Sequence, residues 1–221
     1  MGDSIPTTEL CDRFEETYTE AIADVLDDRG YEDQTLRSDI GPVVDGVSMA
    51  GTAYPIVGRP NRSVDPEETT ERLLELLGKV PPDAVQIYET NDPVGAHVGE
   101  LTATTLQERG CRGVVVDGGA RDVSYTRRLG FPVFSRHVTP ADAIQQWEVI
   151  DWNATTVVGG VRVEPGDVVV GDPDGVVVVP ADDAAEVLVE VESRVDDESQ
   201  VRTALEQGDD PLDLYREYEA F

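Results

Sequence analysis

The amino-acid sequence predicts a single mixed α/β domain with a β-rich C-terminal flank and helices at both ends. Its 221 residues contain no linker rich in Ser, Gly or Pro, so we expect one domain over 1–221. Residues 84–134 alternate apolar strands with helical segments, as parallel βαβ units do. Beyond residue 148, short valine-rich strands meet at Gly-Gly and Pro-Gly turns, which is typical of antiparallel hairpins. The core is expected over about 15–205, followed by an acidic tail helix over 206–221.

Apolar periodicity, caps and turn residues locate the individual elements. The expected helices cover 7–30, 65–77, 99–109, 122–129 and 182–207. The expected strands cover 43–44, 47–57, 84–88, 113–116, 132–134, 157–158, 161–163, 168–170 and 176–179. Loops are expected at 89–98 and, rich in glycine, at 118–121.

The charge is strongly one-sided, with 46 acidic residues against 17 basic ones and a net charge of −29. Such a surface repels phosphates, which argues against binding DNA or RNA. Acids spread along the whole chain, with Lys79 as its one lysine, suggest a protein of a salt-rich cytoplasm, such as that of a haloarchaeon. This hypothesis expects helical circular dichroism to be lost at low salt. No stretch reaches about 18 continuous apolar residues and the N-terminus has no apolar signal core, so we expect no membrane partner.

Scarce reactive residues exclude several chemistries. Lys79 follows a helix end beside prolines, which argues against a Schiff base. His97 and His137 cannot make a three-histidine zinc site, and Cys11 and Cys111 are expected to be buried small residues. The nucleophile elbow, the P-loop and the dinucleotide-binding glycine motif are all missing. Carboxylates, arginines and backbone amides remain, and these groups suit Mg²⁺ or Mn²⁺.

Two segments concentrate these groups. A helix is expected to begin at Gly99-Glu100-Leu101-Thr102, where first-turn amides can bind a carboxylate. The second segment follows a buried strand and runs Asp117-Gly118-Gly119-Ala120-Arg121-Asp122. It would deliver Asp117, Arg121 and Asp122 to the carboxyl end of that strand, where open α/β sheets bind ligands. Each segment also has a purely structural interpretation. The Asp-Gly-Gly segment can be an ordinary turn, and Arg121-Asp122 a local ion pair that caps the next helix. Glu100 can be an acid that only stabilises the first turn of its helix through the helix dipole.

At these residues the chain resembles the family of class II 4-hydroxy-4-methyl-2-oxoglutarate aldolases and the regulator of ribonuclease activity A. The resemblance extends over roughly 15–205. The motifs that carry it, in order, are Gly51-Thr52-Ala53, Gly99-Glu100-Leu101, Gly113 to Asp122, Gly130 to Phe134, Gly159 to Asp167, and Asp172 to Val176 leading to Pro180.

The resemblance implies a swivelling β/β/α fold, a homotrimer or dimer of trimers, and active sites between subunits. Backbone amides around Leu101 and Thr102 would hold the substrate carboxylate, and Arg121 the keto or enolate oxygen. Asp122 would bind Mg²⁺, with Glu100 reaching the metal through water. Glu198 would do the same from a neighbouring subunit.

These roles imply a metal-dependent lyase that releases pyruvate from a 4-hydroxy-2-oxo acid or from oxaloacetate through an enolate stabilised by arginine and metal. The alternative is a non-catalytic regulator that binds a ribonuclease or another protein. His97 is expected in a structural or surface role, with lining of the pocket as the alternative, and His137 is given no role.

Overall fold

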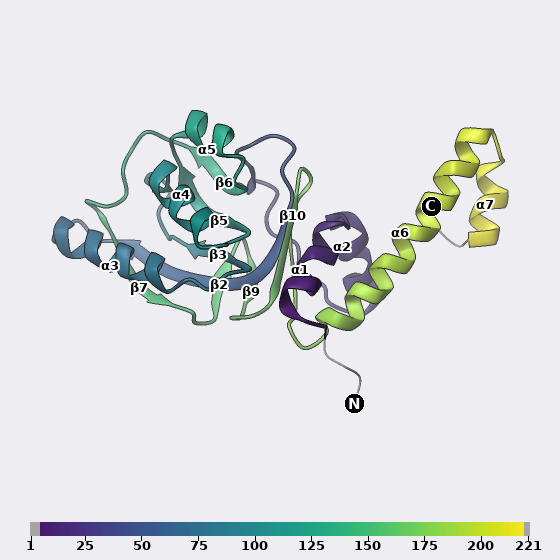
Figure 1. The fold of residues 1–221 in the computed structure, drawn as a ribbon, viewed down its shortest axis with the longest axis horizontal. Helices are drawn as coiled ribbons and strands as arrows, with labels where there is room; N and C mark the ends of the chain where they lie inside the picture. Colours follow the sequence, from purple (N-terminus) through teal and green to yellow (C-terminus); the bar gives the residue numbers. More distant parts are fainter. Residues whose placement is uncertain (1–4, 219–221) are drawn as a thin grey trace.

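The computed structural model describes residues 5–218, which form a mixed α/β fold around one nine-stranded sheet (Figure 1). The sheet strands are β1 Gly41–Pro42, β2 Met49–Pro60, β3 Ala84–Glu89, β4 Ala96–Val98, β5 Gly113–Ala120, β6 Val133–Val138, β7 Trp147–Trp152, β10 Val168–Asp172 and β11 Gly175–Val179. A separate hairpin joins β8 Thr156–Val158 to β9 Val161–Val163. The helices are α1 Thr7–Glu15, α2 Thr19–Asp28, α3 Pro66–Lys79, α4 Glu100–Glu108, α5 Val123–Leu129, α6 Ala184–Gln207 and α7 Pro211–Tyr218. The predicted α/β class is confirmed.

The sheet combines a parallel centre with antiparallel edges, in the order β1-β6-β5-β3-β2-β10-β11. Strands β2, β3, β5 and β6 run parallel to one another, whereas β1, β10 and β11 pair antiparallel with their neighbours. The sheet curls until its end strands, β1 and β11, contact each other, so that it nearly closes. The β-rich flank predicted beyond residue 148 therefore consists of the antiparallel strands β7, β10 and β11 of this sheet and the separate β8–β9 hairpin.

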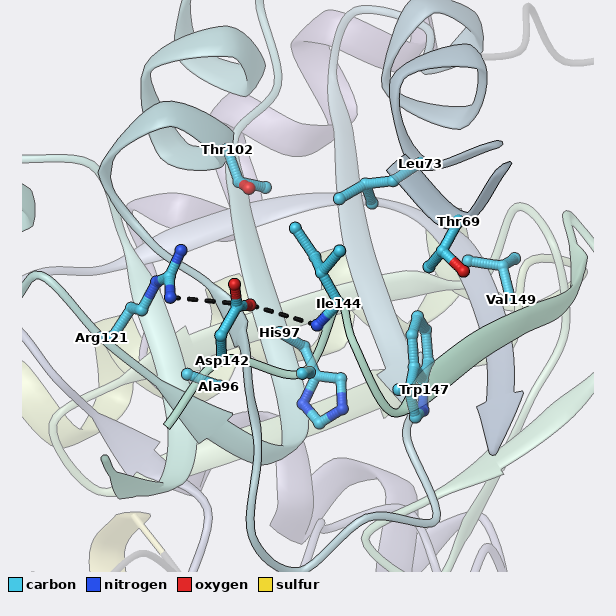
Figure 2. Close-up of a pocket in the computed structure, with 11 residues that line it drawn as sticks. Thr69, Leu73, Ala96, His97, Thr102, Arg121, Asp142, Ile144, Trp147 and Val149 are labelled. Atoms are coloured by element: carbon cyan, nitrogen blue, oxygen red, sulfur yellow. Dashed lines mark hydrogen bonds and ion pairs between the residues drawn. The ribbon is translucent and has the colours of Figure 1, made fainter. Parts of the chain in front are cut away.

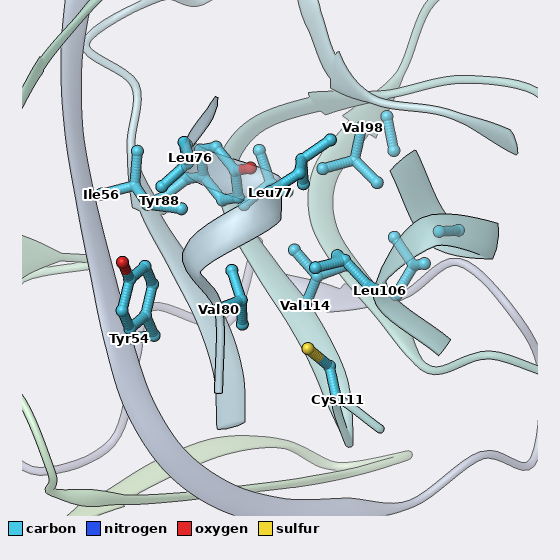
Figure 3. Close-up of a cluster of buried hydrophobic side chains, with 14 of the residues drawn as sticks. Tyr54, Ile56, Leu76, Leu77, Val80, Tyr88, Val98, Leu106, Cys111 and Val114 are labelled. Carbon is cyan, nitrogen blue, oxygen red and sulfur yellow. The ribbon is translucent and has the colours of Figure 1, made fainter. Parts of the chain in front are cut away.

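Strand β5 lies between two hydrophobic cores, which explains its continuous run of valines. Val114 and Val116 face the outer core beneath α3 and α4, where Tyr88, Leu76 and Leu106 also lie (Figure 3). Val115 points the other way, into the inner core closed by the β8–β9 hairpin. Side chains alternate across a strand, so a strand buried on both faces is apolar throughout.

Helices cover the outside of the sheet in two groups. Helices α3 and α4 lie over the parallel strands, while α1, α2 and the start of α6 form a third core with β10 and β11. The rest of α6 and then α7 extend away from the sheet, on the side opposite α3, α4 and α5 (Figure 1). The predicted tail helix begins at Pro211, and residues 219–221 of that prediction lie outside the described range. Within residues 5–218, no helix has the length and apolar character needed to cross a membrane.

The single helix predicted over 7–30 is wrong, because α1 ends at Glu15 and α2 starts at Thr19. Tyr18 adopts an extended conformation between them. Asp172, at the far end of β10, accepts hydrogen bonds from the amide and the hydroxyl of Thr19, both at 2.8 Å. Asp172 lies 153 residues away from Thr19 in the sequence and caps the start of α2. The apolar periodicity continues through the break, so the sequence pattern alone does not reveal it.

The loops predicted at 89–98 and 118–121 are also partly strand. Strand β4 pairs with the end of β5, which continues through Gly118 and Gly119 to Ala120. A Cβ added to Gly118 would lie 2.6 Å from the Thr90 hydroxyl, and a Cβ added to Gly119 would lie 2.6 Å from the Gly95 carbonyl oxygen. These glycines therefore admit close neighbours and do not form a flexible turn.

Candidate functional site

Arg121 and Asp122 lie directly after β5, where the chain turns into α5. The amide of Arg121 donates to the carbonyl of Val98 at 2.9 Å, which continues the pairing of β5 with β4. Asp122 has φ 59° and ψ 33°, a left-handed conformation that aspartate tolerates better than most residues. This turn directs the Asp122 carboxylate back towards α4.

The Asp122 carboxylate caps the start of α4. Its Oδ2 accepts a hydrogen bond from the amide of Glu100 at 3.1 Å, whereas Gly99 at the N-cap position has no side chain to do so. The first amide bonded within the helix is that of Ala103, which donates to Gly99 O at 3.0 Å. The amides of Leu101 and Thr102 therefore precede the internal hydrogen bonds of the helix and are suited to an anionic ligand. The structure brings Gly99–Thr102 together with Arg121 and Asp122, as the sequence suggested.

Gly99 is required for this close approach. A Cβ at this position would lie 2.5 Å from Asp122 Oδ2 and 3.0 Å from Arg121 Cγ. Its φ of −143° is open to any residue, so crowding alone, and not backbone strain, restricts the position to glycine.

For the pyruvate release that the family resemblance implies, we expect Gly99→Ala to lower kcat/KM by about 10- to 100-fold. The added methyl group would displace Asp122 or Arg121, and a shift on the order of 1 Å in such a positioned group costs about that much. The matched control is Gly78→Ala in α3, where an added Cβ meets nothing within 4 Å. Both proteins should keep wild-type circular dichroism in the far ultraviolet. Wild-type kcat/KM in Gly99→Ala would show that the packing of Gly99 against Asp122 does not matter.

The Arg121 guanidinium lies between two carboxylates. Its Nε is 3.7 Å from Asp122 Oδ2, and its Nη1 is 3.5 Å from Asp142 Oδ1. About a third of the Arg121 side chain is exposed, so the guanidinium is fixed in place and remains reachable for a ligand.

Asp142 comes from a segment for which the sequence suggested no role. The amide of Ala96 donates to the Ala141 carbonyl at 2.8 Å, and the amide of Ala143 donates to the Ala96 carbonyl at 3.3 Å. The segment thus lies along β4, and Asp142 also accepts a hydrogen bond from the amide of Ile144 at 3.1 Å. Only long-range pairing brings this carboxylate to Arg121, so no local sequence signal could have identified it.

A cavity of about 50 Å³ opens beside Arg121 (Figure 2). Thr102 of α4, Arg121 and Asp142 line one side. The other side is formed by apolar side chains of α3, of the segment before β7 and of β7 itself: Leu73, Ile144, Trp147 and Val149. The cavity is therefore bounded by the first turn of α4 and the Arg121 cation on one side and by an apolar wall on the other.

His97 is buried and lines this cavity, which excludes the surface role considered from the sequence. Its ring meets Trp147 edge-on, with the ring centroids 4.8 Å apart. Burial lowers the pKa of His97 to about 4, an effect that nearby Asp92 only partly opposes. The imidazole is therefore neutral near pH 7. His137 lies in β6.

The structure separates Asp117 from the other candidates. Asp117 Oδ2 accepts a hydrogen bond from the amide of Gly159 at 3.1 Å. Its Oδ1 lies 3.4 Å from Arg37 Nη2 and 3.3 Å from Arg136 Nη1. The expectation that the strand end would deliver Asp117 beside Arg121 is therefore wrong, because β5 continues for three residues beyond Asp117.

Glu198 lies on α6, C-terminal to Val187, Leu188 and Val191, which pack in the core with β10 and β11. Its carboxylate accepts a hydrogen bond from the Tyr18 hydroxyl. It takes no part in the site of its own chain, so its expected role depends on a neighbouring subunit.

Among the described residues, one group of three acidic side chains lies close enough to share a metal ion, and it is away from Asp122. Carboxylate oxygens of Glu20, Asp172 and Asp174 lie within 4.8 Å of one another. Both oxygens of Asp172 already accept hydrogen bonds, from Thr19 and from the amide of Asp174. This cluster therefore holds the start of α2 and the β10–β11 turn. Cys11 and Cys111 are buried free thiols, as expected.

Comparisons with known proteins identify relatives of this chain. The RraA-like family model, described as Aldolase/RraA, matches residues 7–178. A protein of Halalkalibacterium halodurans named "Putative 4-hydroxy-4-methyl-2-oxoglutarate aldolase" is 30% identical over 191 residues, which cover 86% of each chain.

Two solved structures share the fold. Streptomyces coelicolor RraAS2, described as an unusual member of the RNase ES inhibitor RraA family, has a TM-score of 0.77 at 27% identity, covering 91% of this chain and 98% of its own. An uncharacterized Pseudomonas syringae protein has a TM-score of 0.83 at 24% identity, covering 96% and 99%, which supports the fold alone. With most of its length matched by the family model and its fold shared with an RraA protein, the chain belongs to the RraA-like (Aldolase/RraA) family.

Proposed function

We propose that this protein is a divalent-metal-dependent lyase that releases pyruvate from a 4-hydroxy-2-oxo acid or from oxaloacetate. The observation that carries the proposal is that Arg121 and Thr102, in the first turn of α4, line one cavity, while Asp122 Oδ2 lies 3.1 Å from the Glu100 amide and 3.7 Å from Arg121 Nε. The name of the Halalkalibacterium halodurans relative supports an aldolase reaction.

The substrate's carboxylate would bind the amides of Leu101 and Thr102, where the helix dipole favours negative charge. Its 2-keto oxygen would then face Arg121. When the C3–C4 bond breaks, its electron pair moves into the enolate of pyruvate, and Arg121 is already in place for the charge on that oxygen. Asp122 and Asp142 hold the guanidinium, so little reorganisation is needed.

The residues at this site fit a hard divalent cation. Asp122 presents a carboxylate that is 41% exposed. Glu100, the first residue of α4, supplies a second carboxylate near it. Carboxylates with several waters are the usual ligands of Mg²⁺, and Mn²⁺ accepts the same set. When bound, such an ion acts as a Lewis acid on the keto group. Glu198 of a neighbouring subunit would add a further acid in a homotrimer or a dimer of trimers.

Protons would move through water. In aldol cleavage the C4 hydroxyl loses its proton as the bond breaks, and C3 of the enolate later gains one. Glu100 is partly exposed beside the site and can hold such a water, whereas His97 is buried.

The test is pyruvate release, followed by the oxidation of NADH through lactate dehydrogenase, for a panel of 4-hydroxy-2-oxo acids and oxaloacetate. We expect turnover with Mg²⁺ and its loss with excess EDTA, restored by adding Mg²⁺ or Mn²⁺. Turnover unaffected by EDTA would contradict the role of the metal. If no substrate gave pyruvate, the result would favour the alternative, a non-catalytic regulator. The similarity to RraAS2, described as a member of an RNase ES inhibitor family, supports that alternative.

A further inference from the structure

The cavity beside Arg121 has an apolar far wall. Trp147 presents only its ring, because its Nε1 donates to the Thr90 carbonyl at 2.7 Å. The Thr69 hydroxyl is likewise engaged, donating to the Asp65 carbonyl at 3.1 Å. Leu73 and Ile144 lie between these residues and Arg121 (Figure 2).

Within residues 5–218 of this chain, the residues that line the cavity leave no cation for a second anionic group. Among the described lining residues, Arg121 carries the one positive charge, and two carboxylates already flank it. His97 is neutral near pH 7. Arg62 lines an exposed groove together with Asp142 and Gln145, so Asp142 lines both this groove and the cavity.

The cavity is also small. Its volume of about 50 Å³ is a few times the roughly 10–15 Å³ that a single water needs. A group of a few heavy atoms fits, and such a group gains from contact with the indole and the aliphatic side chains. A carboxylate there would lose its hydration without gaining a partner.

We propose that the aldol substrate of this chain is a monoanion whose C4 end carries small uncharged groups, and not a second carboxylate. This inference rests on the proposed function, since it places the 2-oxo acid end at Arg121 and the first turn of α4. The apolar wall then receives the substituents of C4, and Asp142 repels a carboxylate at the same position.

A matched pair of substrates tests the proposal with the wild-type protein. In 4-hydroxy-4-methyl-2-oxopentanoate a methyl group replaces the C4 carboxylate of 4-hydroxy-4-methyl-2-oxoglutarate. The first compound yields pyruvate and acetone, and the second yields two pyruvates, so rates are compared per bond cleaved. We expect kcat/KM to favour the monoanion by at least about tenfold, the scale on which a pocket discriminates a single group.

Variants locate the source of the preference. Ile144→Lys places a cation at the cavity, and should raise kcat/KM for the dicarboxylate mainly through a lower KM. Arg62→Ala should leave the preference unchanged. Circular dichroism checks that both variants fold.

The outcomes separate this inference from the proposed function. A wild-type preference for the dicarboxylate would overturn the inference and leave the lyase intact. If Arg62→Ala then abolished that preference, the second carboxylate would bind in the outer groove. Absence of turnover for both compounds and for oxaloacetate would overturn the inference and the proposed function together.

Discussion

Replacing Arg121 with alanine is expected to lower kcat/KM for pyruvate release by a factor on the order of 10³ or more. Removing one preorganised oxyanion donor costs about 10²–10³, and this change also deprives Asp122 and Asp142 of their shared cation. Two carboxylates would then face the substrate's negative charge. The coupled assay for pyruvate measures the loss directly.

The matched control is Arg162→Ala. Arg162 lies in the β8–β9 hairpin, is 65% exposed and pairs with Glu164, so its removal should change neither activity nor folding. The Arg121 variant should keep the wild-type circular dichroism and oligomeric state. Turnover within about tenfold of wild type in folded Arg121→Ala would refute the assignment of Arg121 to the developing enolate.

Replacing Asp122 with asparagine should lower kcat/KM by at least about 10²-fold at millimolar Mg²⁺, since changes around a metal ligand already cost 10- to 100-fold. Asparagine tolerates the left-handed backbone, and its amide oxygen can still accept the hydrogen bond from Glu100. The substitution therefore removes the charge and keeps the cap of α4. Activity should be measured across a range of Mg²⁺ concentrations.

Asp45→Asn serves as the control, because Asp45 is 93% exposed and pairs only loosely with Arg127 at 3.6 Å. If Asp122→Asn retained both wild-type activity and the wild-type dependence on Mg²⁺, Asp122 would act only as the cap of α4. A weaker response to Mg²⁺ with unchanged folding is the expected result.

The sequence predicted the central part of this fold well, because local signals specify it. Asp65 and Pro66 start α3 as expected, and the Asp65 carboxylate accepts a hydrogen bond from the amide of Glu67. The buried valines of β5 and the Gly-Gly turn of the β8–β9 hairpin are equally local features. The family resemblance, and not a local signal, placed Arg121 and Asp122 opposite the helix start at Gly99.

The errors arose where distant residues decide the local structure. Asp172 splits the predicted N-terminal helix by binding Thr19. Gly118 and Gly119 were predicted as a loop, but pairing of β4 with the end of β5 makes them part of a strand. Asp142 reaches Arg121 only through pairing with β4, so its part in the site required the tertiary structure.

The most direct test of the site is a crystal structure of the protein with Mg²⁺ and oxalate, a planar dianion that resembles the enolate of pyruvate. We expect one carboxylate of oxalate on the amides of Leu101 and Thr102, an oxygen of the other within hydrogen-bond distance of Arg121, and the ion beside Asp122. Oxalate bound elsewhere, for instance at Arg37 and Arg136, with the cavity beside Arg121 holding only water, would contradict the assignment.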